Sequence, residues 1–373
     1  MFFVREILIL IHGNSMVKVL FILKRREDYN CEIHTNIGLS TGLYNSAKLV
    51  NDMLAENGID SALEVAIDNN CIDRHVTTHR PTHVIIEALW VVPTKFTVLI
   101  PLHQRVEWII RLHSEMPFMA GEGMAMDWLG EYAKFPQITI ACNAPRMLNE
   151  IQLYLGKDRV IYLPNYYPIN HITKKIDKSK QYIDIGCFGA IRPLKNQLLQ
   201  AFAAIKFAES IGKKLNFHVN AGRVEMQGGP VKHNLIGLFD HLHERGHALV
   251  SHQWAPREEF LNVVGAMDIS MQCNFSETFN IVAADSTSQG VPVVASTEIP
   301  WSDIDNADPN SSDDIAEKLA NAYKNPKMNV CTHQTSLLKY CEKSVKIWVK
   351  YFEKPLPPGG AKYQWYYRFL IKR

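Results

Sequence analysis

Residues 276–296, SETFNIVAADSTSQGVPVVAS, place two carboxylates, Glu277 and Asp285, eight positions apart and ahead of an apolar run. The preceding MDISMQC is strand-like, NFSETF is typical of a loop, and NIVAADSTSQG predicts a helix that ends at Gly290. Glu277 then lies in a loop at the carboxyl end of a strand, and Asp285 about two turns into the following helix. The spacing predicts that both carboxylates face one ligand.

The start of this helix is a candidate phosphate site. The backbone N–H groups of Phe279, Asn280 and Ile281 would form its N-terminus, where unpaired donors and the helix dipole attract anions. The two carboxylates could accept hydrogen bonds from the hydroxyls of a sugar. The alternative is an ordinary buried strand, loop and helix whose acids lie on the surface.

Apolar runs alternate with helical patterns on both sides of this stretch. VKVLFIL (17–23), VIIEA (84–88) and WIIRL (108–112) are strand-like in the first half, and IDIGCFGAI (183–191) and LNFHVNAG (215–222) in the second. Such alternation is typical of βαβ units on parallel sheets. In such sheets, ligands bind beyond the carboxyl ends of the strands.

The chain of 373 residues is too long for one ordinary core and suits two domains. A polar, Lys-rich linker at 169–182 separates a domain at 17–168 from one at 183–345. Residues 1–16 are interpreted as an upstream extension, because Met16 opens the first strand-like run. Residues 346–373 form an aromatic and basic tail, which we expect to dock on the N-terminal domain.

Composition excludes several classes of protein. The formal net charge of +2 is almost balanced, so an attraction to nucleic acid or anionic lipid would have to come from local patches. Seven scattered cysteines without a CxxC pair argue against a disulfide framework or a thiolate zinc site, which favours a cytoplasmic location. No apolar run approaches the roughly 20 residues of a membrane span.

Two further loops predict contacts with an anion. Gly38 and Gly42 lie between the first strand and first helix, where glycine permits close backbone approach. Arg192 and Lys195 follow a strand and directly precede a helix, where two cations oppose the helix dipole unless an anion sits between them. A diphosphate would resolve that conflict. The alternatives are a simple strand-to-helix turn and two solvated surface cations.

Together these segments resemble the retaining GT-B glycosyltransferases of the group 1 or family 4 type. That family has a Glu-x7-Glu signature before a Gly-x-Pro-Val-Val-Ala strand. The resemblance extends from about residue 17 to 345 and includes IGLSTGLYNSAKLV, RLHSEMPF, YLPNYY and GAIRPLKN, in the order of the family. It implies two Rossmann-like domains that face each other across a cleft.

The resemblance also implies a reaction and a set of residues. A sugar would pass from a nucleoside-diphosphate sugar to an acceptor hydroxyl by front-face displacement with retention, without a metal or another cofactor. The implied catalytic residues are Glu277, His113, Arg192 and Lys195. The implied donor-binding residues are Gly38, Gly42, Arg192, Lys195, Phe279, Asn280, Ile281 and Asp285. Glu277 and His113 would orient the sugar, and Asp285 would hold the ribose.

The sequence departs from the family pattern at three positions. Thr278 and Asn280 stand where the family usually has glycines, so the backbone turn there is tighter, although Asn tolerates unusual dihedral angles well. Asp285 replaces the usual Glu, which shortens the arm toward the ribose by one methylene.

Three groups are weaker metal candidates. Asp303 and Asp305 form a DxD sequence after the last strand-like run. Two sets of histidines have a spacing that could suit a metal ion. Pro81 interrupts the first set, and the second set is more often a solvated helix end. The first set is His75, His79 and His83, and the second is His241, His243 and His247.

The sequence leaves the acceptor open. The tail KYQWYYRFLIKR could dock on the first domain or contact nucleic acid through stacking and phosphate contacts. Residues 90–128 resemble stretches of glycosyltransferases from large tailed phages, which implies a hydroxymethylated pyrimidine in DNA as the acceptor and the host cytoplasm as the location. The alternatives are a surface glycan or glycolipid, a GT-B-like sugar-nucleotide epimerase, and a silent nucleic-acid-binding module.

Overall fold

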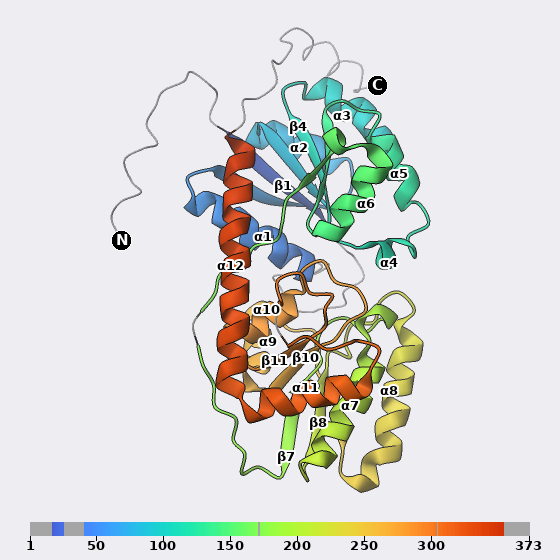
Figure 1. Ribbon diagram of the computed structural model, residues 1–373. Helices are drawn as coiled ribbons and strands as arrows, with labels where there is room; N and C mark the ends of the chain where they lie inside the picture. The colour runs from blue at the N-terminus through green and yellow to red at the C-terminus, as the bar shows by residue number, and fades with distance from the viewer. Residues whose placement is uncertain (1–16, 26–40, 171, 304, 354–373) are drawn as a thin grey trace, which may run out of the picture.

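The structure is a computed structural model that describes residues 17–25, 41–170, 172–303 and 305–353. Figure 1 shows two α/β domains, one above the other, with one long helix running along both. The two parallel α/β domains expected from the alternation of strand and helix patterns are confirmed.

The N-terminal domain contains a six-stranded, fully parallel sheet of order β2-β1-β3-β4-β5-β6. Its central strands are buried on both faces, because helices cover both sides of a parallel sheet. The strands are β1 (Lys18–Lys24), β2 (Asp60–Ala66), β3 (His83–Glu87), β4 (Glu107–Leu112), β5 (Ile138–Cys142) and β6 (Val160–Tyr162). The helices are α1 (Thr41–Glu56), α2 (Cys71–His79), η1 (Pro93–Lys95), α3 (Phe96–Leu102), α4 (Met116–Met119), α5 (Ala125–Tyr132), α6 (Pro145–Leu155) and η2 (Lys157–Arg159).

The C-terminal domain contains a five-stranded parallel sheet of order β11-β10-β7-β8-β9. Its strands are β7 (Tyr182–Gly186), β8 (Lys214–Val219), β9 (Ala248–Ser251), β10 (Ile269–Gln272) and β11 (Val293–Ala295). Its helices are η3 (Pro193–Lys195), α7 (Gln197–Ser210), α8 (Gly228–Leu242), η4 (His243–Arg245), α9 (Arg257–Ala266), α10 (Ile281–Ser288) and α11 (Ser312–Lys324).

Strand β7 is shorter than the apolar run 183–191 predicts. The ladder with β8 ends at Gly186, and Gly189 has a φ of +116° that a strand cannot accommodate. The Gly189 N–H donates to Asn220 Oδ1 at 2.9 Å instead. The chain therefore leaves the sheet early and forms a loop beside the cleft.

Helix α12 (Pro326–Phe352) joins the two domains. Trp348 and Phe352 pack in the core cluster that contains Phe21 of β1, and Trp348 Nε1 donates to Pro164 O at 2.8 Å. Residues 346–352, at the start of the predicted tail, thus belong to this helix. Glu353 caps this helix, and the tail beyond it, 354–373, and the extension 1–16 lie outside the described residues.

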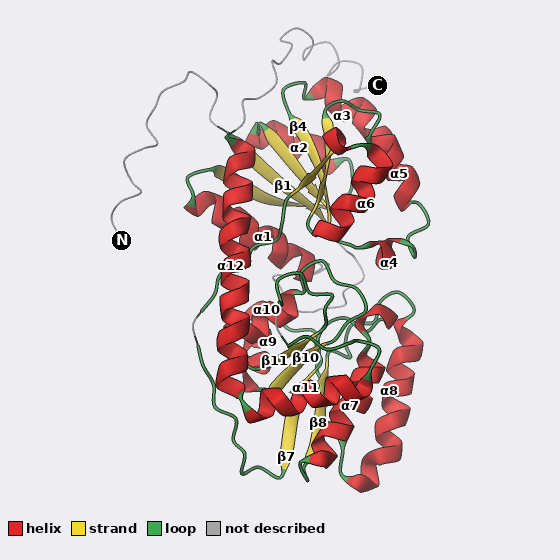
Figure 2. Cartoon of the chain, viewed as in Figure 1, coloured by secondary structure: helices red, strands yellow, loops and turns green. Residues whose placement is uncertain are grey.

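Within the described ranges, no helix has both the length and the hydropathy that crossing a bilayer requires. Figure 2 shows that the loops of the C-terminal domain gather between the two sheets, in the middle of the molecule. This is where the carboxyl ends of parallel strands are expected to place a ligand.

Candidate functional site

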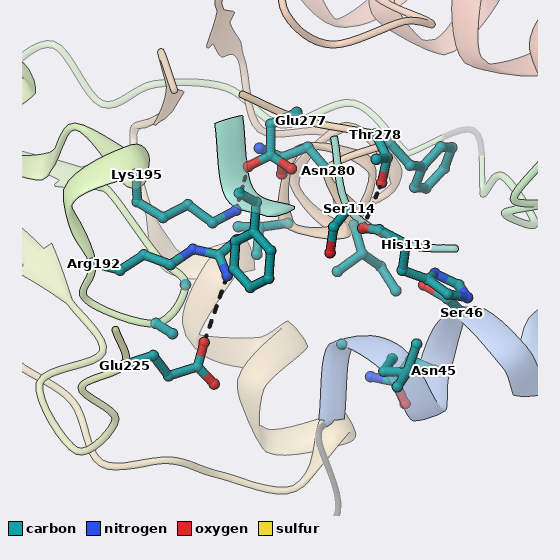
Figure 3. Close-up of a pocket in the computed structure, with 18 of the residues that line it drawn as sticks. Asn45, Ser46, His113, Ser114, Arg192, Lys195, Glu225, Glu277, Thr278 and Asn280 are labelled. Carbon is teal, nitrogen blue, oxygen red and sulfur yellow. Dashed lines mark hydrogen bonds and ion pairs between the residues drawn. The ribbon is translucent and has the colours of Figure 1, made fainter. Parts of the chain in front are cut away.

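A cavity of about 700 Å³ lies between the two domains and is lined by loops from both. Figure 3 shows Arg192, Lys195 and Glu225 on one side of it, and Asn45, Ser46 and His113 on another. Of the predicted site residues, the structure brings nine to this cavity: Gly42, His113, Arg192, Lys195, Glu277, Phe279, Asn280, Ile281 and Asp285. Gly38 lies outside the described residues.

The loop between β10 and α10 is held by Asn280. This residue has a left-handed backbone, with a φ of +61°, and its Oδ1 caps the helix by accepting from Ala283 N at 2.9 Å. Its Nδ2 donates to Gln272 Oε1 at 2.9 Å. Asn is among the few residues that adopt this backbone without a large penalty, so it can stand where the family that the sequence resembles usually has glycine.

Glu277 is buried in the same loop and forms an ion pair with Lys195. Asn274 Nδ2 also donates to Glu277 Oε1, at 2.6 Å. Burial lowers the pKa of Lys195, although the neighbouring carboxylate opposes that shift. The pair joins the loop after β7 to the loop after β10, which places a cation and a carboxylate side by side at the cavity.

Arg192 lies near Lys195 on the same wall. Its guanidinium is 4.8 Å from the ring centroid of Phe118 in the opposite domain, and Nη1 is 3.6 Å from Glu225 Oε2. The Nε of Arg192 is buried and has no hydrogen-bond partner among the described residues. An unpaired buried donor is costly, so this position favours an acceptor supplied from the cavity.

Asp285 lies about one turn into α10, since the helix begins at Ile281, and not two turns as the sequence suggested. Its Oδ1 accepts from Tyr167 OH at 2.7 Å and from Arg257 Nη2 at 2.8 Å. Burial raises the pKa of Asp285, while Arg257 and Tyr167 pull it back down. Asp285 and Glu277 therefore border the same cavity, and each carboxylate has two protein partners.

His113 is bound to a buried charged group behind the cavity wall. Its Nε2 contacts Glu87 at the end of β3, which also forms an ion pair with Arg111 of β4 at 3.1 Å. The ring Nδ1 is 3.3 Å from Asn143 Nδ2. Because Glu87 is an anion and needs a donor, Nε2 of His113 carries the proton and Nδ1 accepts from Asn143. Both ring nitrogens therefore have hydrogen-bond partners within the protein.

Asn143 and Thr278 connect the two domains beside His113. Thr278 Oγ1 donates to the backbone oxygen of His113 at 3.2 Å (Figure 3). The same Oγ1 is 3.2 Å from Asn143 Nδ2. Arg146 makes a second connection, because it pairs with Glu115 at 3.0 Å and with Glu298 of the other domain at 2.7 Å. The position of the loop that carries Glu277 is thus tied to the N-terminal domain.

Five further residues of the site were not predicted from the sequence: Glu87, Arg111, Asn143, Tyr167 and Arg257. Glu87 and Arg111 carried a usable signal, because each is a charge inside an otherwise apolar strand sequence, where a fully buried side chain needs a partner. The others carried none, since their roles depend on which loops the fold brings together.

The metal candidates do not gather at this cavity. His75 and His79 contact Glu64, at 3.3 and 2.7 Å, and Asp305 pairs with Lys318 at 2.7 Å. Over the described ranges, no group of three or more histidine, cysteine or acidic side chains could hold a metal ion.

The charges around His113 predict a loss of stability in acid. Burial lowers the pKa of His113 below its ordinary value of 6.5, so the unfolded chain takes up that proton first and stability falls as the pH drops below 6.5. Burial would raise the pKa of Glu87, but Arg111 and His113 outweigh it and hold the pKa below 4.5. The stability that the Glu87 carboxylate contributes to the folded protein is therefore lost only at a pH below 4.5.

We expect the thermal unfolding midpoint to fall from pH 7 to pH 4. In His113→Gln, which keeps a donor for Glu87, the part of the decline between pH 6.5 and 5 should shrink. Differential scanning calorimetry of both proteins measures this. An identical pH profile for the two proteins would contradict the role given to His113.

The sequence matches no protein-family model and no curated protein sequence. The fold has clear counterparts among solved structures. Sucrose-phosphate synthase from Thermosynechococcus elongatus is similar with a TM-score of 0.65 and 10% identity, over 90% of this chain and 98% of that one. A UDP-forming α,α-trehalose-phosphate synthase from Burkholderia xenovorans gives 0.62 and 11%, over 91% and 99%.

A third similar structure is a trehalose-6-phosphate synthase studied with bisubstrate glycomimetics for glycosyl transfer with retention. It has a TM-score of 0.56 and 12% identity over 76% of each chain. At these identities the likeness shows the fold. The chain has the GT-B fold of two Rossmann-like domains, as the sequence predicted, and the similar structures are glycosyltransferases.

Proposed function

We propose that this protein is a retaining glycosyltransferase that uses a nucleoside-diphosphate sugar. The observation that carries the proposal is the Glu277–Lys195 pair, which faces a cavity between two GT-B domains with Arg192 beside it. A carboxylate can accept hydrogen bonds from sugar hydroxyls, while the two cations stabilise the negative charge that develops on a departing diphosphate.

In the proposed reaction, the bond between the anomeric carbon and the β-phosphate oxygen breaks, and its electron pair leaves with the nucleoside diphosphate. The acceptor oxygen attacks from the same face, and its proton passes to the departing phosphate oxygen. Glu277 orients the sugar, whereas His113, with protein partners at both ring nitrogens, shapes the cavity wall beside it. The amide groups at the start of α10 add to the positive potential. No metal takes part in this scheme.

The donor half of the proposal is tested by release of nucleoside diphosphate from a panel of UDP-, GDP- and ADP-sugars, with NMR of the product to establish retention at the anomeric carbon. Inversion at C2 of the donor without transfer would identify an epimerase. No turnover, together with DNA binding that weakens steeply with salt, would identify a silent module.

For the acceptor, we propose a hydroxymethylated pyrimidine in phage DNA, an assignment supported by the sequence resemblance of residues 90–128 and by the basic, aromatic tail. A target base would leave the duplex to reach a cavity of this kind. Mass spectrometry of nucleosides from hydroxymethylated DNA incubated with enzyme and donor tests this. Transfer only to glycan or lipid acceptors would overturn the DNA assignment and leave the glycosyltransferase proposal intact.

Replacing Arg192 by Ala should weaken binding of a free nucleoside diphosphate by about 1.5–3 kcal/mol, the range for hydrogen bonds to charged groups. Lys195→Ala should weaken it similarly, although it also leaves the buried Glu277 without its cation. Titration calorimetry measures both. Arg245→Ala, an exposed cation paired with Glu209 and outside the cavity lining, is the control and should bind normally. Unchanged affinity in both cavity variants would refute the diphosphate site.

Chelation by EDTA should leave donor turnover unchanged, because side-chain cations stabilise the leaving group in the proposed scheme. The measurement is the initial rate of sugar transfer with EDTA and after addition of Mn²⁺. Loss of activity that Mn²⁺ restores would contradict metal independence and bring Asp303 and Asp305 back as candidate ligands.

A further inference from the structure

Arg257 occupies a place in the cavity that the sequence analysis did not assign to any residue. It is the first residue of α9, and its side chain lines the cavity. A cation at this end of a helix opposes the helix dipole, which favours acidic groups there. An anion close to the guanidinium would offset this cost.

Asp285 is that anion. Its Oδ1 accepts from Arg257 Nη2 at 2.8 Å, and the same Nη2 donates to Tyr167 OH at 3.1 Å. The guanidinium also lies 5.7 Å from the centroid of the Tyr167 ring. Tyr167 completes the group by donating its own O–H to Asp285 Oδ1. These contacts hold one edge of the guanidinium in a fixed orientation.

Arg257 is more accessible to a ligand than Asp285. The Asp285 side chain is 2% exposed, against 27% for Arg257. Only Nη2 of Arg257 makes hydrogen bonds to described residues, which leaves Nε and Nη1 for a partner in the cavity. Both contacts of Asp285 use Oδ1, and Oδ2 has no hydrogen-bond partner among the described residues, so the group presents the free donors of Arg257 beside one carboxylate oxygen.

We propose that Arg257 contacts the ribose of the nucleoside diphosphate directly, by donating an N–H to the 2′-hydroxyl oxygen, and that Asp285 is a positioning residue that acts through Arg257. This inference rests on the proposed function. It adds a cationic donor to the ribose contact that the family resemblance gives to the carboxylate. Arg192 and Lys195 supply the diphosphate contacts from the loop after β7, whereas Arg257 borders the cavity from α9, beside α10.

The test compares UDP, GDP and ADP with their 2′-deoxy forms by titration calorimetry on the full chain. The wild-type protein should bind the ribose form on the order of tenfold more tightly, the free energy of one charge-assisted hydrogen bond. In Arg257→Met this preference should fall to about one, and affinity for the ribose form should drop by the same order. Arg192→Ala should weaken both forms equally and keep the preference.

Asp285→Asn retains an Oδ1 acceptor for Arg257 and Tyr167, so it should keep most of the ribose preference. If Arg257→Met keeps the full preference, or if the wild type has none, the inference is overturned. If no nucleoside diphosphate binds the wild type, the proposed function fails and the inference falls with it. Should Arg257→Met not fold because Asp285 is left unpaired, the double variant with Asp285→Asn removes both charges and gives the same comparison.

Discussion

Glu277→Gln is expected to lower sugar transfer on the order of a hundredfold or more, because misplacing a reacting group by about an ångström has effects of this size. The substitution keeps the length of the side chain and an oxygen for Asn274, but removes the charge that Lys195 pairs with. Affinity for free nucleoside diphosphate should barely change, since that ligand lacks the transferred sugar. Steady-state kinetics and titration calorimetry give the two quantities.

Asp285→Ala is the matched comparison for this experiment. It removes the anion that orients Arg257, so the dissociation constant of the nucleoside diphosphate should rise, with a smaller effect on the transfer step. The Glu277 variant should therefore lose transfer rate and keep its nucleotide affinity, whereas the Asp285 variant should mainly lose nucleotide affinity. Equal nucleotide affinity in both variants would show that the eight-residue spacing does not mark two contacts with one donor.

Arg111→Met should destabilise the folded protein by about 3–5 kcal/mol, the cost of leaving a buried charge without its partner. Arg111 and Glu87 are fully buried, and the guanidinium also donates to the backbone oxygens of Leu163 and Pro164, at 3.1 and 3.0 Å. It lies 5.3 Å from the Trp348 ring centroid of α12. One residue thus connects β4, the chain leaving β6 and the helix that joins the domains. Urea unfolding measures the loss.

Two control variants separate charge from packing at this site. Adding Glu87→Gln to Arg111→Met removes the unpaired carboxylate and should recover part of the lost stability. Lys48→Met breaks an exposed pair with Asp52 on α1, and should cost only about 0–1 kcal/mol. A loss below about 1 kcal/mol in Arg111→Met would contradict the role of Arg111 as the buried connection between these elements.

The sequence predicted the two sheets because parallel strands buried on both faces are continuous apolar runs, as in β1 and β3. It also placed Glu277, Arg192 and Lys195 in loops that follow strands, since turn residues and helix starts are local signals. The ends of the strands were predicted less accurately than their existence. The predicted end of β7 was wrong because Gly189 adopts a positive φ, which the apolar pattern around it does not reveal.

Local sequence thus determined which residues lie in loops that follow strands, because strand, loop and helix patterns depend on neighbours a few positions away. Tertiary structure decided what those residues contact. Lys195 meets Glu277 across 82 positions, and Tyr167 meets Asp285 across 118. The first pair forms because the loops after β7 and β10 lie at the same edge of one sheet, and the second because the chain leaving β6 packs against α10. Burial then shifts the pKa of Lys195 and of Asp285, which depends on the packed surroundings and on no local pattern.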